Sequence, residues 1–279
     1  MHRSLRTRQL FLVLCLLLAA APAFAQATQT QKPQTFQPQV GQGGKDVVWV
    51  PTPQILVDKM LDMTGVTAQD FVMDLGSGDG RTVITAAKRG AHAMGIEYNP
   101  DMVELSKQNA EKEGVSGRAQ FVKADLFETD LSRATVITMF LLPDINLRLR
   151  PKILELKPGT RIVSNTFTME DWNADEIATV GEDCTSWCTA LFWIVPAKAE
   201  GTWTFPNGEL TLTQTFQMLA GTMRIGDKSA PISDGRLRGD QISFAVGGVK
   251  YAGKVNGAAM SGTAATGSTT TPWTATKVK

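Results

Sequence analysis

The chain has few of the side chains that bind metals. Its 279 residues include two histidines and three cysteines, and His2 and Cys15 lie in the first 25 residues. His92, Cys184 and Cys188 remain, so no Cys/His quartet can be assembled and we predict no metal site. The close cysteine pair is predicted to form a disulfide in an oxidising compartment, with two free thiols as the alternative.

The chain also lacks a long hydrophobic run and an excess of basic charge. Its N-terminal apolar run, residues 10–21, is too short for a comfortable membrane span. Three arginines precede this run and Ala23-Phe24-Ala25 follows it, which is the order of a secretory signal. We predict cleavage after Ala25 and a periplasmic or secreted mature chain.

The mature chain has 25 basic and 27 acidic residues, a formal charge of −2, because the removed segment contains three of the 28 basic residues and no acid. A nucleic-acid-binding protein normally presents a basic surface. We therefore predict no nucleic-acid partner and no stable membrane span. The oligomeric state is left open.

Composition divides the chain into four segments. Residues 1–25 are the predicted signal peptide, and residues 26–47, rich in Gln, Pro and Gly, are predicted to be a flexible linker. Residues 48–196 alternate apolar runs with helical patterns, which predicts an α/β fold with a doubly wound sheet and a terminal antiparallel hairpin. Residues 197–279 show short alternating segments separated by glycine, which predicts a small all-β antiparallel domain, either a barrel or a sandwich.

A glycine-rich segment gives the clearest indication of a ligand. Asp74-Leu75-Gly76-Ser77-Gly78-Asp79-Gly80 follows an apolar run and precedes a helical pattern. This spacing lets the backbone approach a nucleoside-type ligand, but it is not the G-x-G-x-x-G of dinucleotide folds. Asp74 would repel a diphosphate and suits a cationic ligand such as S-adenosylmethionine, which carries a sulfonium and an ammonium. A tight turn between strand and helix is the alternative interpretation.

Two further acids end predicted strands. Glu97 lies 17 residues after Gly80, about where a Rossmann-like sheet places an acid on ribose hydroxyls. Asp125 ends the third predicted strand and is expected to accept the adenine amino group, with the backbone N–H of Leu126 left for a ring nitrogen. Together with the glycine loop, these acids predict a nucleoside site.

Two more residues are assigned to the same pocket. Thr52, followed by Pro53, is predicted to cap a helix that closes one side of the pocket. Tyr98 is predicted to lie over the adenine face, with ordinary packing as the alternative.

With these residues the chain resembles the class I S-adenosylmethionine-dependent methyltransferases. It is most similar to the small protein-lysine N-methyltransferases related to those acting on mitochondrial membrane proteins, over roughly residues 48–196. Ser77 and Asn165 stand where that branch usually has cysteine and histidine. The segments that carry the closer likeness are Val50-Pro51-Thr52-Pro53, Gly78-Asp79-Gly80-Arg81, Asp125-Leu126-Phe127, Phe140-Leu141-Leu142-Pro143, Leu149-Arg150-Pro151, Pro158-Gly159-Thr160-Arg161 and Asp171-Trp172.

The resemblance implies transfer of a methyl group from S-adenosylmethionine to a protein lysine. Phe140 and Trp172 are then expected to flank the lysine methylene chain, and Asp144 to orient the amine or accept its proton. Packing in the core is the alternative for the two aromatic rings, and capping of the following helix is the alternative for Asp144. The loop after the fourth strand lacks the Asn/Asp-Pro-Pro-Tyr of many enzymes that methylate amide or base nitrogens.

The expected compartment conflicts with the expected cofactor, because S-adenosylmethionine is made in the cytosol and does not cross a bilayer unaided. Two interpretations therefore stay open. The chain is either an exported methyltransferase, acting on a protein or a small molecule, or an exported non-catalytic nucleoside- or envelope-binding protein on a methyltransferase scaffold.

Overall fold

The computed structural model describes residues 36–181 and 183–278. The predicted signal peptide, residues 1–25, and residues 26–35 of the predicted linker lie outside the described residues. Within the described residues no helix is both long and apolar enough to cross a membrane.

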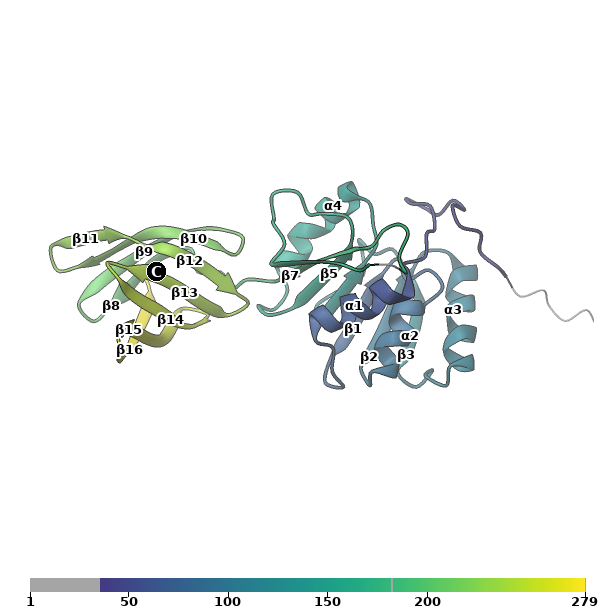
Figure 1. Cartoon of the computed structure of the whole chain (residues 1–279), viewed down its shortest axis with the longest axis horizontal. Helices are drawn as coiled ribbons and strands as arrows, with labels where there is room; N and C mark the ends of the chain where they lie inside the picture. The colour runs from purple at the N-terminus through teal and green to yellow at the C-terminus, as the bar shows by residue number, and fades with distance from the viewer. Residues whose placement is uncertain (1–35, 182, 279) are drawn as a thin grey trace, which may run out of the picture. The chain divides into compact units, whose positions relative to one another are not determined.

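Seven strands form the sheet of the α/β domain, in the order β3-β2-β1-β4-β5-β7-β6 (Figure 1). Strands β1 to β5 pair in parallel, whereas β7 is antiparallel to both β5 and β6. The predicted α/β sheet with a terminal antiparallel hairpin is confirmed. The strands are β1 (Phe71–Leu75), β2 (His92–Glu97), β3 (Ala119–Lys123), β4 (Val136–Met139), β5 (Arg161–Asn165), β6 (Glu176–Thr179) and β7 (Thr189–Ile194).

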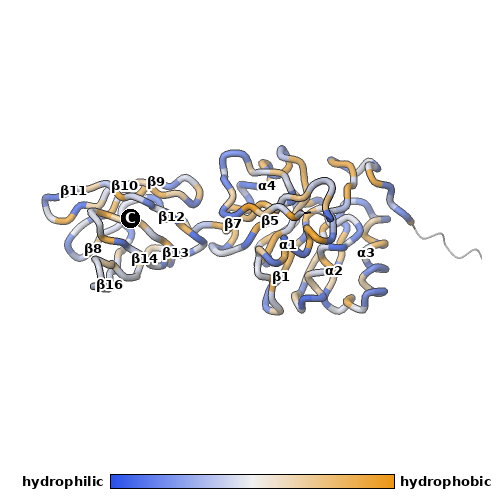
Figure 2. Tube along the Cα trace, in the orientation of Figure 1, coloured by the Kyte–Doolittle hydropathy of each residue, from blue (hydrophilic) through white to orange (hydrophobic). Residues whose placement is uncertain are grey.

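Four helices cover this sheet: α1 (Gln54–Thr64), α2 (Arg81–Lys88), α3 (Pro100–Lys112) and α4 (Pro143–Leu154). Successive side chains of a strand point to opposite faces. Val72 of β1 accordingly packs with α1, α2 and α3, while Met73 and Leu75 pack with α4. Because both faces are covered, the central strands are hydrophobic stretches (Figure 2).

The strand order reverses between β1 and β4, since β1 pairs with β2 on one side and with β4 on the other. In a parallel sheet of this kind, ligands bind at the carboxyl ends of the strands next to the point of reversal. The glycine loop follows β1 at this edge, and the loop with Phe140 follows β4.

The C-terminal segment forms a closed antiparallel barrel of eight strands, with the short strand β11 added on β10. The barrel closes because β10 pairs with both β9 and β12. This is more specific than the predicted barrel or sandwich. Its strands are β8 (Gly201–Phe205), β9 (Gly208–Thr215), β10 (Met218–Ile225), β11 (Lys228–Pro231), β12 (Ser233–Arg238), β13 (Gln241–Val246), β14 (Val249–Asn256), β15 (Ala259–Thr266) and β16 (Thr269–Lys277).

Candidate active site

The glycine loop, residues 76–80, joins β1 to α2. Gly78 has a φ of 54°, and a Cβ at this position would lie 2.6 Å from Nε1 of Trp49. Gly80 has a φ of 84°, and its Cβ would lie 2.8 Å from the ring of Phe121. Both positions therefore require glycine: Gly78 for close approach at the ligand edge, Gly80 for packing of α2 on the sheet.

A cavity of about 560 Å³ opens at the carboxyl ends of the parallel strands. Its wall is mostly apolar, with a few carboxylates, which is the usual composition of a small-molecule site. Most of the predicted site residues line it: Thr52, Asp74, Gly76, Gly78, Glu97, Tyr98, Asp125, Leu126 and Phe140.

The Glu97 carboxylate is held at the end of β2 by two backbone donors. The N–H of Gly78 donates to Oε2 at 3.0 Å, and the N–H of Asn99 donates to Oε1 at 2.9 Å. Each carboxylate oxygen has a further lone pair. Glu97 is thus fixed in place and can still accept the ribose hydroxyls that its position in the sequence assigns to it.

Asp125 forms an ion pair that the sequence did not indicate. Lys45 Nζ donates to its Oδ2 at 2.6 Å and lies 4.9 Å from the centre of the Tyr98 ring. The hydrogen bonds from Lys45 and from the N–H of Phe127 hold the pKa of Asp125 below its usual value. The predicted adenine end therefore carries one lysine beside its carboxylate and its aromatic ring.

Asp74 is the most perturbed acid of the cavity. Burial raises its pKa to about 7, against the hydrogen bond that Thr138 Oγ1 donates at 2.5 Å, and the nearby Asp79 and Glu97 raise it further. Asp79 itself forms an ion pair with Arg81 at 2.6 Å. Asp74 and Glu97 therefore make this end of the cavity favourable for a cation.

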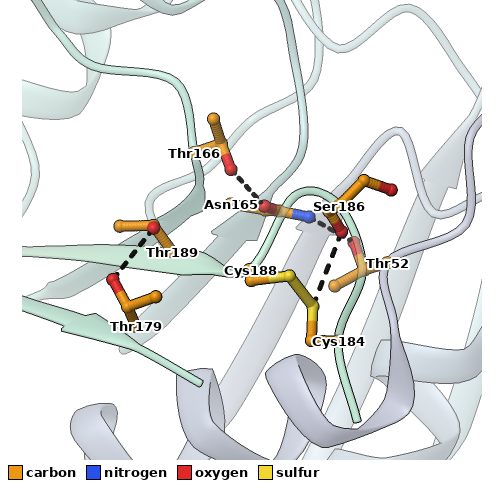
Figure 3. The surroundings of a disulfide bond; sticks show 8 residues. All are labelled: Thr52, Asn165, Thr166, Thr179, Cys184, Ser186, Cys188 and Thr189. Carbon is orange, nitrogen blue, oxygen red and sulfur yellow. Dashed lines mark hydrogen bonds between the residues drawn. A yellow bond between two sulfur atoms is a disulfide. The ribbon is translucent and has the colours of Figure 1, made fainter. Parts of the chain in front are cut away.

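Thr52 lines the cavity through contacts other than the predicted helix cap. Helix α1 begins at Gln54, and its flanking residue Pro53 makes no side-chain cap. Oγ1 of Thr52 instead accepts a hydrogen bond from Nδ2 of Asn165 at 3.3 Å (Figure 3). Its carbonyl accepts one from Arg81 at 3.0 Å. Thr52 thus links α1, α2 and the end of β5.

The opposite part of the cavity is aromatic. The ring centres of Phe140 and Phe167 are 5.8 Å apart, and Trp187 lies 5.7 Å from Phe140 and 5.4 Å from Phe167. Leu141, Leu142 and Ile145 add apolar wall. A long apolar side chain would be held here by hydrophobic contact.

Residues 42–51 also line the cavity. The N–H of Gly41 donates to the carbonyl of Trp49, and that of Trp49 donates to the carbonyl of Gln42, both at 2.9 Å. The structure thus gives residues 41–47 a defined place beside the ligand edge, which the interpretation of residues 26–47 as a flexible linker did not anticipate. The turn formed by these hydrogen bonds, together with the Lys45 ion pair, is the physical reason.

Three predicted site residues do not line the cavity. Gly80 has the packing role described above. Asp144 is exposed in the first turn of α4, so this geometry does not support its expected role on the acceptor amine; an acid there favours the helix N-terminus. Trp172 is fully buried, 6.2 Å from Trp193 between ring centres, so the core alternative holds for it.

Residues that the sequence reasoning missed are Trp49, Phe167 and Trp187, all of which line the cavity. Phe167 follows β5 at the ligand edge, as Phe140 follows β4, so its position after a parallel strand was a usable signal. Trp187 stands next to Cys188, and the disulfide Cys184–Cys188 is present in the structure.

The residues present fit S-adenosylmethionine. Gly78 leaves room for a ligand where a side chain would clash, and the buried Oγ of Ser77 lines the cavity without a hydrogen-bond partner among the described residues. Glu97 and Asp125 would hold the ribose and the adenine, and Asp74 the charged amino-acid end. Within the described residues no group of three or more His, Cys, Asp or Glu could hold a metal ion.

Known proteins match the α/β domain. Residues 74–176 match the family model described as the ANTKMT methyltransferase domain. A protein-lysine N-methyltransferase of Saccharolobus islandicus is 49% identical over 137 residues, covering 48% of this chain and 85% of the relative. A human lysine N-methyltransferase, whose description names the ATP synthase, is 34% identical over 143 residues, 46% of this chain, which spans only 61% of that relative.

A solved structure from Salinibacter ruber, described as an RNA methyltransferase in complex with S-adenosyl-L-homocysteine, is 44% identical with a TM-score of 0.50. It covers 53% of this chain and 95% of its own. The glycine loop, the strand-end acids and these matches agree. The chain belongs to the class I S-adenosylmethionine-dependent methyltransferases, in the family of the protein-lysine N-methyltransferases.

Proposed function

We propose that this protein methylates lysine side chains of other proteins, using S-adenosylmethionine. The observation that carries the proposal is the aromatic part of the cavity, Phe140, Phe167 and Trp187, next to the carboxylates that suit the cofactor. The 49% identity to a protein-lysine N-methyltransferase supports it.

The chemistry asks little of the protein beyond positioning. Bound S-adenosylmethionine supplies a methyl carbon activated by a sulfonium. The cavity must hold a lysine Nζ in line with that carbon, and the amine must be neutral to act as a nucleophile. Apolar walls such as Phe140 and Leu142 penalise the ammonium and so lower the pKa of the lysine, whose proton is lost to water.

The direct test is transfer of tritiated methyl groups from S-adenosylmethionine into envelope and cytosolic extracts of the native host. We expect label in protein, located on lysine by mass spectrometry, with a rate that rises with pH until the amine is deprotonated. Gly76→Arg, which fills the ligand edge, is the inactive control.

The Salinibacter ruber relative makes a nucleic acid the second candidate acceptor, because its description names RNA. Label that is removed by ribonuclease and not by protease would favour that acceptor. Label confined to small molecules would favour a small-molecule methyltransferase. Tight cofactor binding with no label in any fraction would favour a non-catalytic binding protein.

We also propose that the protein is exported and that residues 1–25 are removed. The order of arginines, apolar run and Ala-x-Ala supports this, as does the Cys184–Cys188 disulfide, which is the kind of bond that persists in oxidising compartments. Mass spectrometry of the protein from its native host should find an N-terminus at Gln26. An intact N-terminus in the cytosolic fraction would contradict export and would remove the problem of cofactor supply.

A further inference from the structure

The disulfide-closed loop between β6 and β7, residues 180–188, emerges at the ligand edge of the sheet. Strand β7 is antiparallel to β5 and pairs Ala190 with Asn165, so β7 starts where β5 ends. The hydroxyls of Thr179 and Thr189 join the base of the hairpin at 3.0 Å (Figure 3). Topology therefore brings this loop next to the residues that follow β5.

The tip of the loop is held in one shape. Cys184 and Cys188 are bridged, with their Cα atoms 5.8 Å apart, and the N–H of Val180 donates to the carbonyl of Cys188 at 2.9 Å. The N–H of Cys184 donates to the carbonyl of Gly181 at 3.1 Å. Such a short bridged loop leaves few conformations for the residues inside it.

Trp187 sits in this loop in an unfavourable conformation. Its φ is 57°, in the left-handed region that non-glycine residues rarely adopt, and 40% of the residue is exposed. Burial in a core does not explain such a tryptophan. Strain of this kind persists where surrounding structure imposes it, and it gathers at binding sites.

The Trp187 ring instead completes the aromatic wall. It contacts the cavity together with Phe140, which follows β4, and Phe167, which follows β5, with ring centres 5.4 to 5.8 Å apart. Three rings from three loops surround one space. Aromatic faces attract an ammonium and a methylated ammonium, and they pack on a methylene chain.

We propose that Trp187 is an acceptor-binding residue of the active site, and that Cys184 and Cys188 are positioning residues that hold its ring against Phe140 and Phe167. The inference rests on the proposed lysine methylation. It assigns the disulfide a role in acceptor binding, because opening the bridge releases the loop that carries Trp187. The cofactor end, at Glu97 and Asp125, is formed by other elements and is unaffected.

The test measures methyl transfer with the full mature chain, using total protein extract of the native host as the acceptor at increasing concentration. Trp187→Ala is expected to raise the half-saturating extract concentration about tenfold, the order expected for loss of a desolvated aromatic contact. Trp187→Phe should recover most of the loss. Affinity for S-adenosylhomocysteine should stay within twofold of the parent in both variants.

Ile177→Ala is the matched control, since Ile177 is an exposed apolar residue of β6, on the same hairpin, and does not line the cavity. It should leave the half-saturating concentration unchanged. An equal effect of Ile177→Ala would mean that any damage to the hairpin suffices, which overturns the specific role of Trp187.

The role of the bridge is tested by reduction and by the double variant Cys184→Ser, Cys188→Ser. A dithiol reductant gives two electrons and two protons to the bridge, leaving two thiols, and becomes a cyclic disulfide. Both changes should raise the half-saturating concentration as Trp187→Ala does, and reduction should add nothing further in Trp187→Ala. Fully additive effects would overturn positioning through Trp187.

The outcomes separate the two proposals. Lysine methylation by the parent with unchanged acceptor dependence in Trp187→Ala overturns the role of Trp187 and leaves the proposed function standing. Absence of lysine methylation by the parent, with cofactor binding intact, overturns the proposed function and the acceptor role together.

Discussion

Replacing Asp74 with asparagine removes the one buried carboxyl of the cavity whose pKa is raised to about 7. A cation bound beside Asp74 favours its ionised form, so at pH values below about 7 binding must first release a proton from it. The apparent affinity of the parent should fall about tenfold for each pH unit below 7 and be level above it. In Asp74→Asn, the affinity should be weaker at pH 8 and vary little with pH.

Isothermal titration calorimetry with S-adenosylhomocysteine between pH 5.5 and 8 measures this directly. Runs in two buffers of different ionisation enthalpy report the proton released, which should approach one per site at pH 6 and vanish above pH 8. An affinity independent of pH, with no proton released, would refute the assignment of Asp74 to the charged end of the ligand.

The same carboxyl affects stability with the opposite sign to most acids. Its pKa is raised from 3.8 to about 7 on folding, so its contribution to stability is fully present below about pH 3.8 and is lost as pH rises to 7. At about 1.4 kcal/mol per pKa unit the loss is about 4 kcal/mol. Asn can keep the hydrogen bond from Thr138. Ligand-free Asp74→Asn should therefore melt at a higher temperature than the parent at pH 8 and not at pH 4, as calorimetric scans would show.

Three further variants test the rest of the site. Glu97→Ala should weaken cofactor binding at least tenfold, since hydrogen bonds to charged groups contribute about 1.5–3 kcal/mol; unchanged affinity by calorimetry would contradict its place on the ribose. Gly78→Ala should also weaken binding, because its Cβ would press on Trp49, whereas Gly117→Ala, where a Cβ meets nothing within 4 Å, should not. Asp144→Asn should leave the methyl transfer rate within about twofold of the parent, because this exposed acid lies off the cavity; a loss of tenfold would restore it as an acceptor-side group.

The cofactor end of the site could be predicted from the sequence because its parts are local. The glycine loop directly follows β1, and Glu97 and Asp125 stand at or just after the ends of β2 and β3, so position along the chain determines position at the edge of the sheet. Adjacency did not give side-chain direction. Asp144 follows the same edge, yet the first turn of α4 leaves it on the surface.

Contacts between distant residues could not be predicted in this way. Trp49 meets Gly78 and Lys45 meets Asp125 only because residues 41–49 fold back over the ligand edge, and their Gln- and Gly-rich neighbourhood indicated a linker. Closure of the barrel likewise depends on pairings such as Lys277 with Trp203. Strand β12 was missed because Gly235 and the arginines beside it hide the alternation of buried and exposed residues.

Trp187 lies between these two cases, and topology explains why. The sequence predicted an antiparallel hairpin at the end of a parallel sheet, and in such a sheet the turn between the last two strands must emerge at the carboxyl edge of the parallel strands, where β5 ends. Any aromatic residue in that turn is thereby placed near the ligand. The two cysteines around it then indicate that its position is fixed, so the hairpin topology and the cysteine spacing, taken together, point to the acceptor side of the site that neither indicates alone.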